Sequence, residues 1–214
     1  MSPSKSRRRR PRKKKSNSKK IILIVALLAV VVTIIVGYNM LGNNNPNENV
    51  PNGNNTSSQM KILFETSMGD ITIQLRDDMP ITTENFKNLT LNGVYDSTIF
   101  HRVVNLPQNL VIIQGGDPNG NGMSDDGIPS IFDEFTTDNK NERGTISMAN
   151  AGPNTGSSQF FINAAYNSHL DDAHPVFGKV IDGIGVIDAI SNVNTDPNDR
   201  PLEAVTIIKA TLID

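Results

Sequence analysis

The 214-residue sequence has no cysteine and no tryptophan, and aromatic residues make up only 5% of it. Without cysteine the chain cannot form disulfides or a zinc site with thiolate ligands. The sequence also lacks the G-x-S-x-G, H-E-x-x-H and P-loop patterns, has no G-x-G-x-x-G after a strand, and scatters its three histidines. These absences argue against hydrolase and metalloenzyme classes, and we expect neither a bound metal nor a cofactor.

Acidic residues are absent before Glu48, whereas eleven of the twenty lysines and arginines lie in residues 1–20. Residues 61–214 carry nine basic and twenty-one acidic side chains, a net charge of −12. This acidic part should repel nucleic acids and anionic lipid surfaces, so only the basic head could attract them. We therefore expect no nucleic-acid partner.

Charged residues are also absent from Ile21–Tyr38, a run of eighteen residues that follows Lys19 and Lys20. As a helix this run is about 27 Å long, close to the ~30 Å hydrocarbon core of a bilayer. We predict a transmembrane helix over residues 21–41. A buried core helix is disfavoured because no partner helix is nearby, and a cleaved signal peptide because no A-x-A-like site follows. If the leader is nevertheless cleaved, the protein is secreted.

The basic head precedes the predicted helix, and no basic residue follows closely. The positive-inside rule then places residues 1–20 in the cytoplasm and the rest of this single-pass chain outside the cell membrane. A polybasic run beside a membrane more often contacts anionic headgroups than nucleic acid. Residues 42–59 contain eight asparagines and two prolines, which predicts a flexible linker of about 23 Å root-mean-square length.

The remaining residues, 60–214, form short alternating apolar runs separated by Gly, Asn, Asp and Pro clusters, which predicts a mainly β domain. Ile62–Thr66 and Asp70–Leu75 predict an opening hairpin. Ala204–Asp214 predicts a long closing strand.

Two helical patterns lie between these strands. The first is expected from Thr83 to Asn92, with Thr82 or Thr83 as N-cap and Gly93 as the stop, and the second from Ile184 to Ser191. Strands at both ends with two isolated helices predict an antiparallel β-barrel whose open ends are plugged by helices.

Polar residues stand out in four strand-like segments: FHR at 100–102, QGGD at 114–117, SMANAGPNTGSSQFFI at 147–162 and HPVFGKV at 174–180. Polar groups in such places need hydrogen-bond partners or a substrate. Each segment also has a plainer interpretation, since Arg102 could be a solvated strand residue, Gln114 could close a turn, and Asn150 could form an Asx turn.

Taken together, in this order and spacing, the four segments resemble the cyclophilins, peptidyl-prolyl cis-trans isomerases with an eight-stranded antiparallel β-barrel capped by two α-helices. The resemblance covers Met60–Asp214, and MANAGPNTGSSQFFI at 148–162 is its most specific piece. It implies an enzyme that acts on X-Pro bonds of proline-containing polypeptides, needs no cofactor and, with the membrane anchor, serves as a folding factor. The domain is expected to be monomeric.

The resemblance also implies roles for individual residues. Arg102 matches the catalytic arginine, and Gln114 matches the neighbour that orients it through a hydrogen bond. The residues that match the family's substrate-binding surface are His101, Val111, Ile112, Gly120, Asn121, Ala149, Asn150, Ala151, Gln159, Phe161, His169, Leu170 and His174.

These residue types suit the reaction. Rotation about a peptide bond meets a barrier of about 18–20 kcal/mol, and X-Pro bonds isomerise over tens to hundreds of seconds without a catalyst. As the bond twists, the prolyl nitrogen gains an available lone pair, to which a fixed guanidinium can donate a hydrogen bond. Preferential binding of the twisted form accelerates rotation without any covalent step.

Three departures from the family pattern change the expected site. Eleven residues, Val103–Ile113, separate FHR from QGGD, more than in common family members, so the loop should bulge. Val111 and Ile112 stand where the family usually has Phe and Met, so the proline pocket should be wider, or Leu110 should fill it. His169 replaces a tryptophan that contacts cyclosporin in many members, which predicts weak binding of that drug.

Two other functions stay open. A module that binds proline-containing segments without turnover is suggested by Val111 and Ile112. An adhesion or nucleic-acid protein led by the basic head ranks last, because it requires that residues 1–20 alone reproduce the activity.

Overall fold

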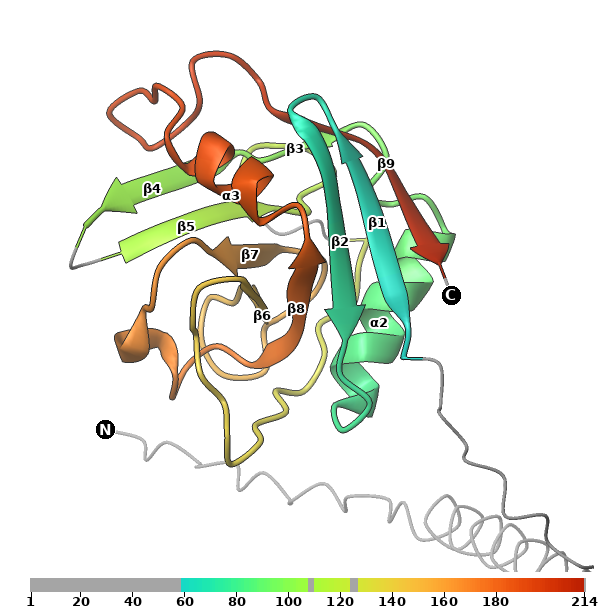
Figure 1. The fold of residues 1–214 in the computed structure, drawn as a ribbon. Coiled ribbons are helices and arrows are strands. Elements are labelled where there is room, and N and C mark those ends of the chain that lie inside the picture. The colour runs from blue at the N-terminus through green and yellow to red at the C-terminus, as the bar shows by residue number, and fades with distance from the viewer. Residues whose placement is uncertain (1–58, 108–109, 124–126, 214) are drawn as a thin grey trace, which may run out of the picture. The chain divides into compact units, whose positions relative to one another are not determined.

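The computed structural model describes residues 59–107, 110–123 and 127–213 (Figure 1). The predicted basic head, the predicted transmembrane helix and the predicted linker up to residue 58 lie outside the described residues. Within the described ranges, no helix has the length and apolar character needed to cross a bilayer.

The described residues form one curled antiparallel sheet and two α-helices (Figure 1). The strands are β1 (Lys61–Thr66), β2 (Gly69–Leu75), β3 (Thr98–Ile99), β4 (Arg102–Leu106), β5 (Leu110–Gly115), β6 (Thr145–Met148), β7 (Phe160–Asn163), β8 (Val176–Asp182) and β9 (Thr206–Ile213). Their order across the sheet is β3-β9-β1-β2-β8-β6-β7-β5-β4. The mainly β class, the opening hairpin and the closing strand predicted from the sequence are confirmed.

The sheet closes differently from the expected eight-stranded barrel. The described residues form nine strands, and the edge strands β3 and β4 are not neighbours in a ladder. They follow each other in the chain, with only Phe100 and His101 between them. Single hydrogen bonds tie this part of the chain to the segment before β9, from the Phe100 N–H to the Val205 oxygen (2.9 Å) and from the Val103 N–H to the Asp199 oxygen (2.7 Å). The course of the chain, rather than a further ladder, therefore closes the curl.

Aromatic side chains fill the inside of the curl. Phe64, Phe86, Tyr95, Phe160 and Phe177 are all fully buried. The Phe86 ring centroid lies 4.9 Å from those of both Tyr95 and Phe177. Burial of each such side chain contributes roughly 1.5–3 kcal/mol, so this cluster is a main source of the domain's stability.

The two helices pack on different parts of the sheet. Helix α3 covers Ile184–Ser191, as predicted, and packs against β2, β4 and β5. Helix α2 covers Pro80–Leu91 and packs against β9, so it begins three residues before the predicted start.

The predicted N-cap of the first helix is wrong. Met79 is the N-cap residue, and both Thr82 and Thr83 are buried within the helix. The unpaired N–H groups of the first turn bind the carboxylate of Glu134, which accepts from the Ile81 N–H at 3.1 Å and from the Thr82 N–H at 2.7 Å. A carboxylate suits a helix N-terminus because it satisfies free N–H groups and complements the helix dipole.

The described residues between FHR and QGGD show no bulge. The β4–β5 ladder runs without a break from the pair Arg102 and Gln114 to the pair Leu106 and Leu110. The additional residues therefore lengthen the paired part of β4 and β5.

Candidate active site

Strand register brings the two predicted catalytic residues together. Arg102 on β4 is the direct cross-strand partner of Gln114 on β5, and Gln114 is the partner of Phe161 on β7. Directly opposed residues point to the same face of a sheet. Arg102, Gln114 and Phe161 therefore form a row across one face of three neighbouring strands.

Apolar side chains extend this face along the β4–β5 hairpin. Val104 opposes Ile112, and Leu106 opposes Leu110. A small cluster forms here, which we call the outer cluster: buried Val104, Ile112 and Phe161, with half-buried Leu110, Ala149 and Leu170 packed against them. Its half-buried members leave this cluster partly open to solvent.

Val111 does not belong to this face. It opposes Asn105, which is an odd number of residues from Arg102, so its side chain points to the other side of the hairpin. Its backbone N–H donates to Asn167 Oδ1 at 3.0 Å, and its carbonyl oxygen accepts from Asn167 Nδ2 at 3.1 Å. Val111 therefore lies on the opposite face of the hairpin from Arg102, whereas Leu110 lies on the Arg102 face. The substrate contact of Val111 stays a prediction.

Arg102 donates its hydrogen bonds to the loop before β9 rather than to Gln114. Its Nε and Nη2 atoms each lie 3.3 Å from Asp199 Oδ2, and the two side chains are 41% and 40% exposed. Gln114 Nε2 instead donates to Gln159 Oε1 at 3.1 Å, and Gln159 Nε2 donates to the Met123 oxygen at 2.8 Å. The predicted orientation of Arg102 by Gln114 is thus replaced by an ion pair with Asp199.

The segment after β6 borders the outer cluster. The Ala149 N–H donates to the Gln159 carbonyl oxygen at 3.0 Å. Asn150 Nδ2 donates to the Ala173 oxygen at 2.8 Å. The Asn150 side chain therefore ties this segment to the loop before β8.

His174 flanks the outer cluster. Its ring stands edge-on to Phe161, with ring centroids 5.2 Å apart. Its Nδ1 atom lies 3.0 Å from the Met148 carbonyl oxygen. Because a carbonyl oxygen only accepts, Nδ1 carries the proton in the neutral ring, and Nε2 is then an acceptor.

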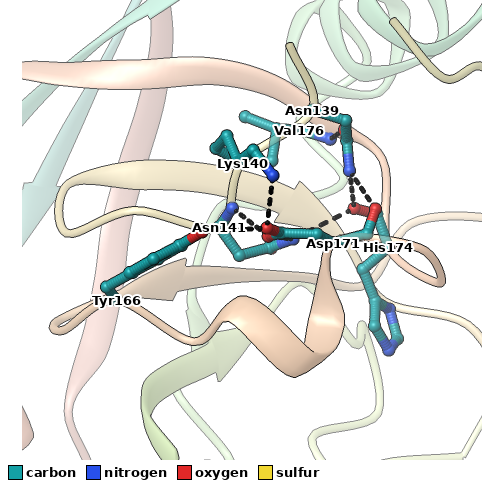
Figure 2. Close-up of polar contacts among 7 residues, drawn as sticks. All are labelled: Asn139, Lys140, Asn141, Tyr166, Asp171, His174 and Val176. Carbon is teal, nitrogen blue, oxygen red and sulfur yellow. Dashed lines mark hydrogen bonds and ion pairs between the residues drawn. The ribbon is translucent and has the colours of Figure 1, made fainter. Parts of the chain in front are cut away.

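Polar contacts fix the loop that carries His174 (Figure 2). The Asp171 carboxylate accepts the Asn141 N–H at 2.7 Å and the Lys140 ammonium at 3.2 Å. Asn139 Nδ2 donates to the carbonyl oxygens of Asp171 and His174. Burial alone would raise the pKa of Asp171, but the hydrogen bonds that its carboxylate accepts lower that pKa below its usual value.

A turn after β5 holds Gly120 and Asn121. The buried Asp117 carboxylate accepts the N–H of Asn121 at 2.7 Å and that of Gly122 at 2.6 Å. Beside this turn lies a cavity of about 360 Å³, lined by His101, Arg102, Gln114, Asn121, Gly122, Asp196, Asn198 and Arg200. The structure therefore brings Arg102 between this polar cavity and the outer cluster.

The other predicted residues lie around these features. His101 is buried, and burial lowers the pKa of its ring. His169, on the short 3-10 helix Ser168–Leu170, and Ala151 are exposed. Within the described ranges, no group of three or more His, Asp or Glu side chains is placed to hold a metal ion.

A family model described as cyclophilin type peptidyl-prolyl cis-trans isomerase/CLD matches residues 61–212. The chain belongs to this family. The activity of the chain is peptidyl-prolyl cis-trans isomerisation.

Individual relatives agree with this assignment. This cyclophilin is 44% identical over 156 residues to peptidyl-prolyl cis-trans isomerase ppi1 of Schizosaccharomyces pombe, a match that covers 71% of this chain and 98% of that protein. It is 41% identical over 167 residues to peptidyl-prolyl cis-trans isomerase CYP71 of Arabidopsis thaliana, which is 76% of this chain but only 26% of that longer protein.

A solved structure shares the fold. The cyclophilin type peptidyl-prolyl cis-trans isomerase of Cryptosporidium parvum, crystallised in the presence of the dipeptide Ala-Pro, is 32% identical to this cyclophilin with a TM-score of 0.66. The match covers 72% of this chain and 99% of that one.

Sequence reasoning missed two contributors to the site of this cyclophilin. Val104 was hidden within an apolar run, although its even spacing from Arg102 places both on one face. Asp199 lies in the segment DPNDRP at 196–201, whose composition indicates only a turn. Its contact with Arg102 spans 97 residues, so no local signal could reveal it.

Proposed function

We propose that this cyclophilin holds the proline ring of its substrate on the outer cluster while Arg102 donates a hydrogen bond to the prolyl nitrogen of the twisted bond. The shared face of β4 and β5 carries this proposal, because Val104–Ile112 is the next pair on the same face after Arg102–Gln114. Alternate residues of a strand lie about 7 Å apart. A ring packed on the apolar pair therefore has its nitrogen within reach of a long guanidinium side chain.

Catalysis then follows from differential binding. The guanidinium is always charged and its donors are rigidly arranged, so its hydrogen bond strengthens as amide resonance is lost. Phe161 and His174 confine the ring, and the Asn150 backbone holds the residue before proline, so that rotation is limited to one side of the bond. The Ala-Pro dipeptide present with the Cryptosporidium relative supports a proline ligand for this surface.

Replacement of Arg102 tests the mechanism. We expect Arg102→Ala in the full chain to lower kcat/KM by roughly ten- to a thousandfold, because a transition-state hydrogen bond from a charged donor is lost. Turnover is measured on an X-Pro peptide by NMR exchange or a protease-coupled assay. Arg143→Ala is the matched control, since Arg143 forms a somewhat more exposed ion pair with Asp188 away from the site. A folded Arg102→Ala variant with full turnover would refute this mechanism.

A non-catalytic proline-binding module is the second candidate, because Ile112 departs from the residue usual in the family. The same NMR experiment separates the two. Chemical-shift changes on peptide addition without faster cis-trans exchange in the wild-type chain would favour the module.

We further propose that the enzyme is a membrane-anchored folding factor outside the cytoplasmic membrane. The uncharged run Ile21–Tyr38 and the eleven basic residues before it support this topology. Protease added to spheroplasts should digest residues 60–214 and spare the basic head. An intact domain protected inside spheroplasts would overturn the orientation, and a trimmed soluble product would indicate a cleaved leader.

A further inference from the structure

The loop before β9 is a tightly closed turn. The Asp196 N–H donates to the Arg200 oxygen at 2.8 Å, and the Asp199 N–H donates to the Asp196 oxygen at 3.0 Å. The Asp196 carboxylate also accepts the N–H groups of Asn198 at 2.8 Å and Arg200 at 3.0 Å. Arg200 Nη1 in turn donates to the Gly120 oxygen at 3.0 Å, which ties the loop to the turn after β5. The backbone around Asp199 is thus held from several sides.

Asp199 occupies an unusual backbone conformation within this loop. Its φ angle is 63°, in the left-handed region that favours glycine and, less strongly, asparagine. In this conformation its carbonyl oxygen accepts the Val103 N–H at 2.7 Å, while its carboxylate contacts Arg102 in the adjacent position of β4. A residue other than glycine in this strained backbone conformation indicates that its side chain has a function.

The contact with Asp199 divides the Arg102 guanidinium into a held edge and a free end. Nε and Nη2 both donate to Asp199 Oδ2. These two atoms share one edge of the planar group, and Nη1 lies at its other end. Among the described residues, Asp199 is the sole hydrogen-bond partner of this guanidinium. Nη1 and one Nη2 proton are therefore available to a substrate.

We infer that Asp199 is a positioning residue that fixes the plane of the Arg102 guanidinium and directs its Nη1 end to the substrate. The inference rests on the proposed function of Arg102. An arginine side chain has several rotatable bonds, and its ordering opposes any hydrogen bond that it makes. An arginine already held by Asp199 avoids that cost when the twisted bond forms.

Two substitutions separate the carboxylate from the backbone conformation. Asp199→Gly removes the side chain without strain at positive φ, and we expect about a tenfold loss of kcat with KM within about twofold of wild type. Asp199→Asn keeps an acceptor oxygen and tolerates the left-handed conformation, so its kcat should stay within about threefold of wild type. Asp188→Asn is the control, because it removes the acidic charge from a somewhat more exposed ion pair, with Arg143.

A double variant shows whether Asp199 acts through Arg102. If it does, Arg102→Ala combined with Asp199→Gly is no slower than Arg102→Ala alone. A further loss in the double variant, or a wild-type kcat for Asp199→Gly when Arg102→Ala is slow, overturns the positioning role and leaves the proposed function intact. Wild-type turnover of Arg102→Ala would instead refute the proposed function itself.

The NMR signal of the Arg102 Nε–H gives a readout that does not depend on turnover. We expect a slowly exchanging, resolved signal in the wild-type chain and a rapidly exchanging one in Asp199→Gly, because the acceptor is lost. Circular dichroism checks folding, and urea unfolding measures any loss of stability in Asp199→Gly. Equal exchange in the wild-type chain and the carboxylate-free variant would contradict the inference.

Discussion

Phe160 and Phe161 are neighbours on β7 but lie in two different apolar environments. Phe160 is fully buried inside the curl, with ring centroids 5.5 Å from Phe64 and Phe86 and 5.7 Å from Tyr95. Phe161 points to the opposite face, into the outer cluster, where half of the members are only half-buried. One strand therefore contributes to stability with one face and to substrate binding with the other.

Alanine substitutions at Phe160 and Phe161 should show the largest difference between the two faces of β7. Phe160→Ala removes a ring enclosed on all sides, and we expect a loss of about 3–5 kcal/mol in the free energy of unfolding. Phe161→Ala leaves a space that water can enter, so its loss should be about 1–3 kcal/mol, while kcat/KM falls by at least about tenfold. Urea unfolding and the isomerase assay on both full-chain variants measure these effects. Equal losses of stability would show that the outer cluster belongs to the structural core.

The outer cluster combines residues from strands with Leu170 from the segment before β8, and Asp171 holds that segment in place. Its buried carboxylate accepts four hydrogen bonds, from Lys140, from the backbone N–H and the side chain of Asn141, and from the Tyr166 hydroxyl. The bond from the Asn141 N–H is the shortest of the four. Asp171→Asn leaves some of these donors without an anionic acceptor, so we expect about 1–3 kcal/mol of destabilisation at pH 7. Asp172→Asn, at the exposed neighbouring position, should change stability by less than about 0.5 kcal/mol.

The pH dependence of this loss follows from the lowered pKa of Asp171. The carboxylate has a lower pKa in the folded state than the value of about 3.9 in the unfolded chain. Its stabilising effect is therefore complete above about pH 4 and is lost as the pH falls toward the folded-state pKa. The difference in thermal unfolding between wild type and Asp171→Asn should be largest at neutral pH and should shrink as the pH falls below about 4. A constant difference across this range would exclude the carboxylate's charge as the cause.

The predictable parts of the fold are those set by local periodicity. The hairpin of β1 and β2 and the helix Ile184–Ser191 were predicted correctly, because alternation and a 3.6-residue period determine which face is buried. The start of α2 was predicted wrongly because its N–H groups bind Glu134, which lies 52 residues away from Thr82. The edges of the sheet also depend on long-range pairing that spacing alone cannot fix.

In the candidate site, too, local patterns were predictable and long-range contacts were not. The family motif selected Arg102, Gln114 and Phe161, and strand register places them in one row. The role of Asp199 depends on a tertiary contact and was not predictable. The face of Val111 could have been predicted from the spacing, since residues three apart on a strand, such as Val111 and Gln114, point to opposite faces.

The two faces of β5 allow a last and smaller test, because the neighbouring apolar residues Leu110 and Val111 point to opposite faces. Leu110 packs half-buried on the outer cluster, so Leu110→Ala should remove apolar contact with the substrate and raise KM by about two- to fivefold. Val111 is buried on the opposite face, so Val111→Ala should reduce stability by about 1 kcal/mol and leave KM unchanged. KM from the isomerase assay and urea unfolding of both variants provide the comparison. A raised KM for Val111→Ala together with a normal KM for Leu110→Ala would mean that the substrate meets the other face of the hairpin, and that the row of Arg102, Gln114 and Phe161 is not the binding surface.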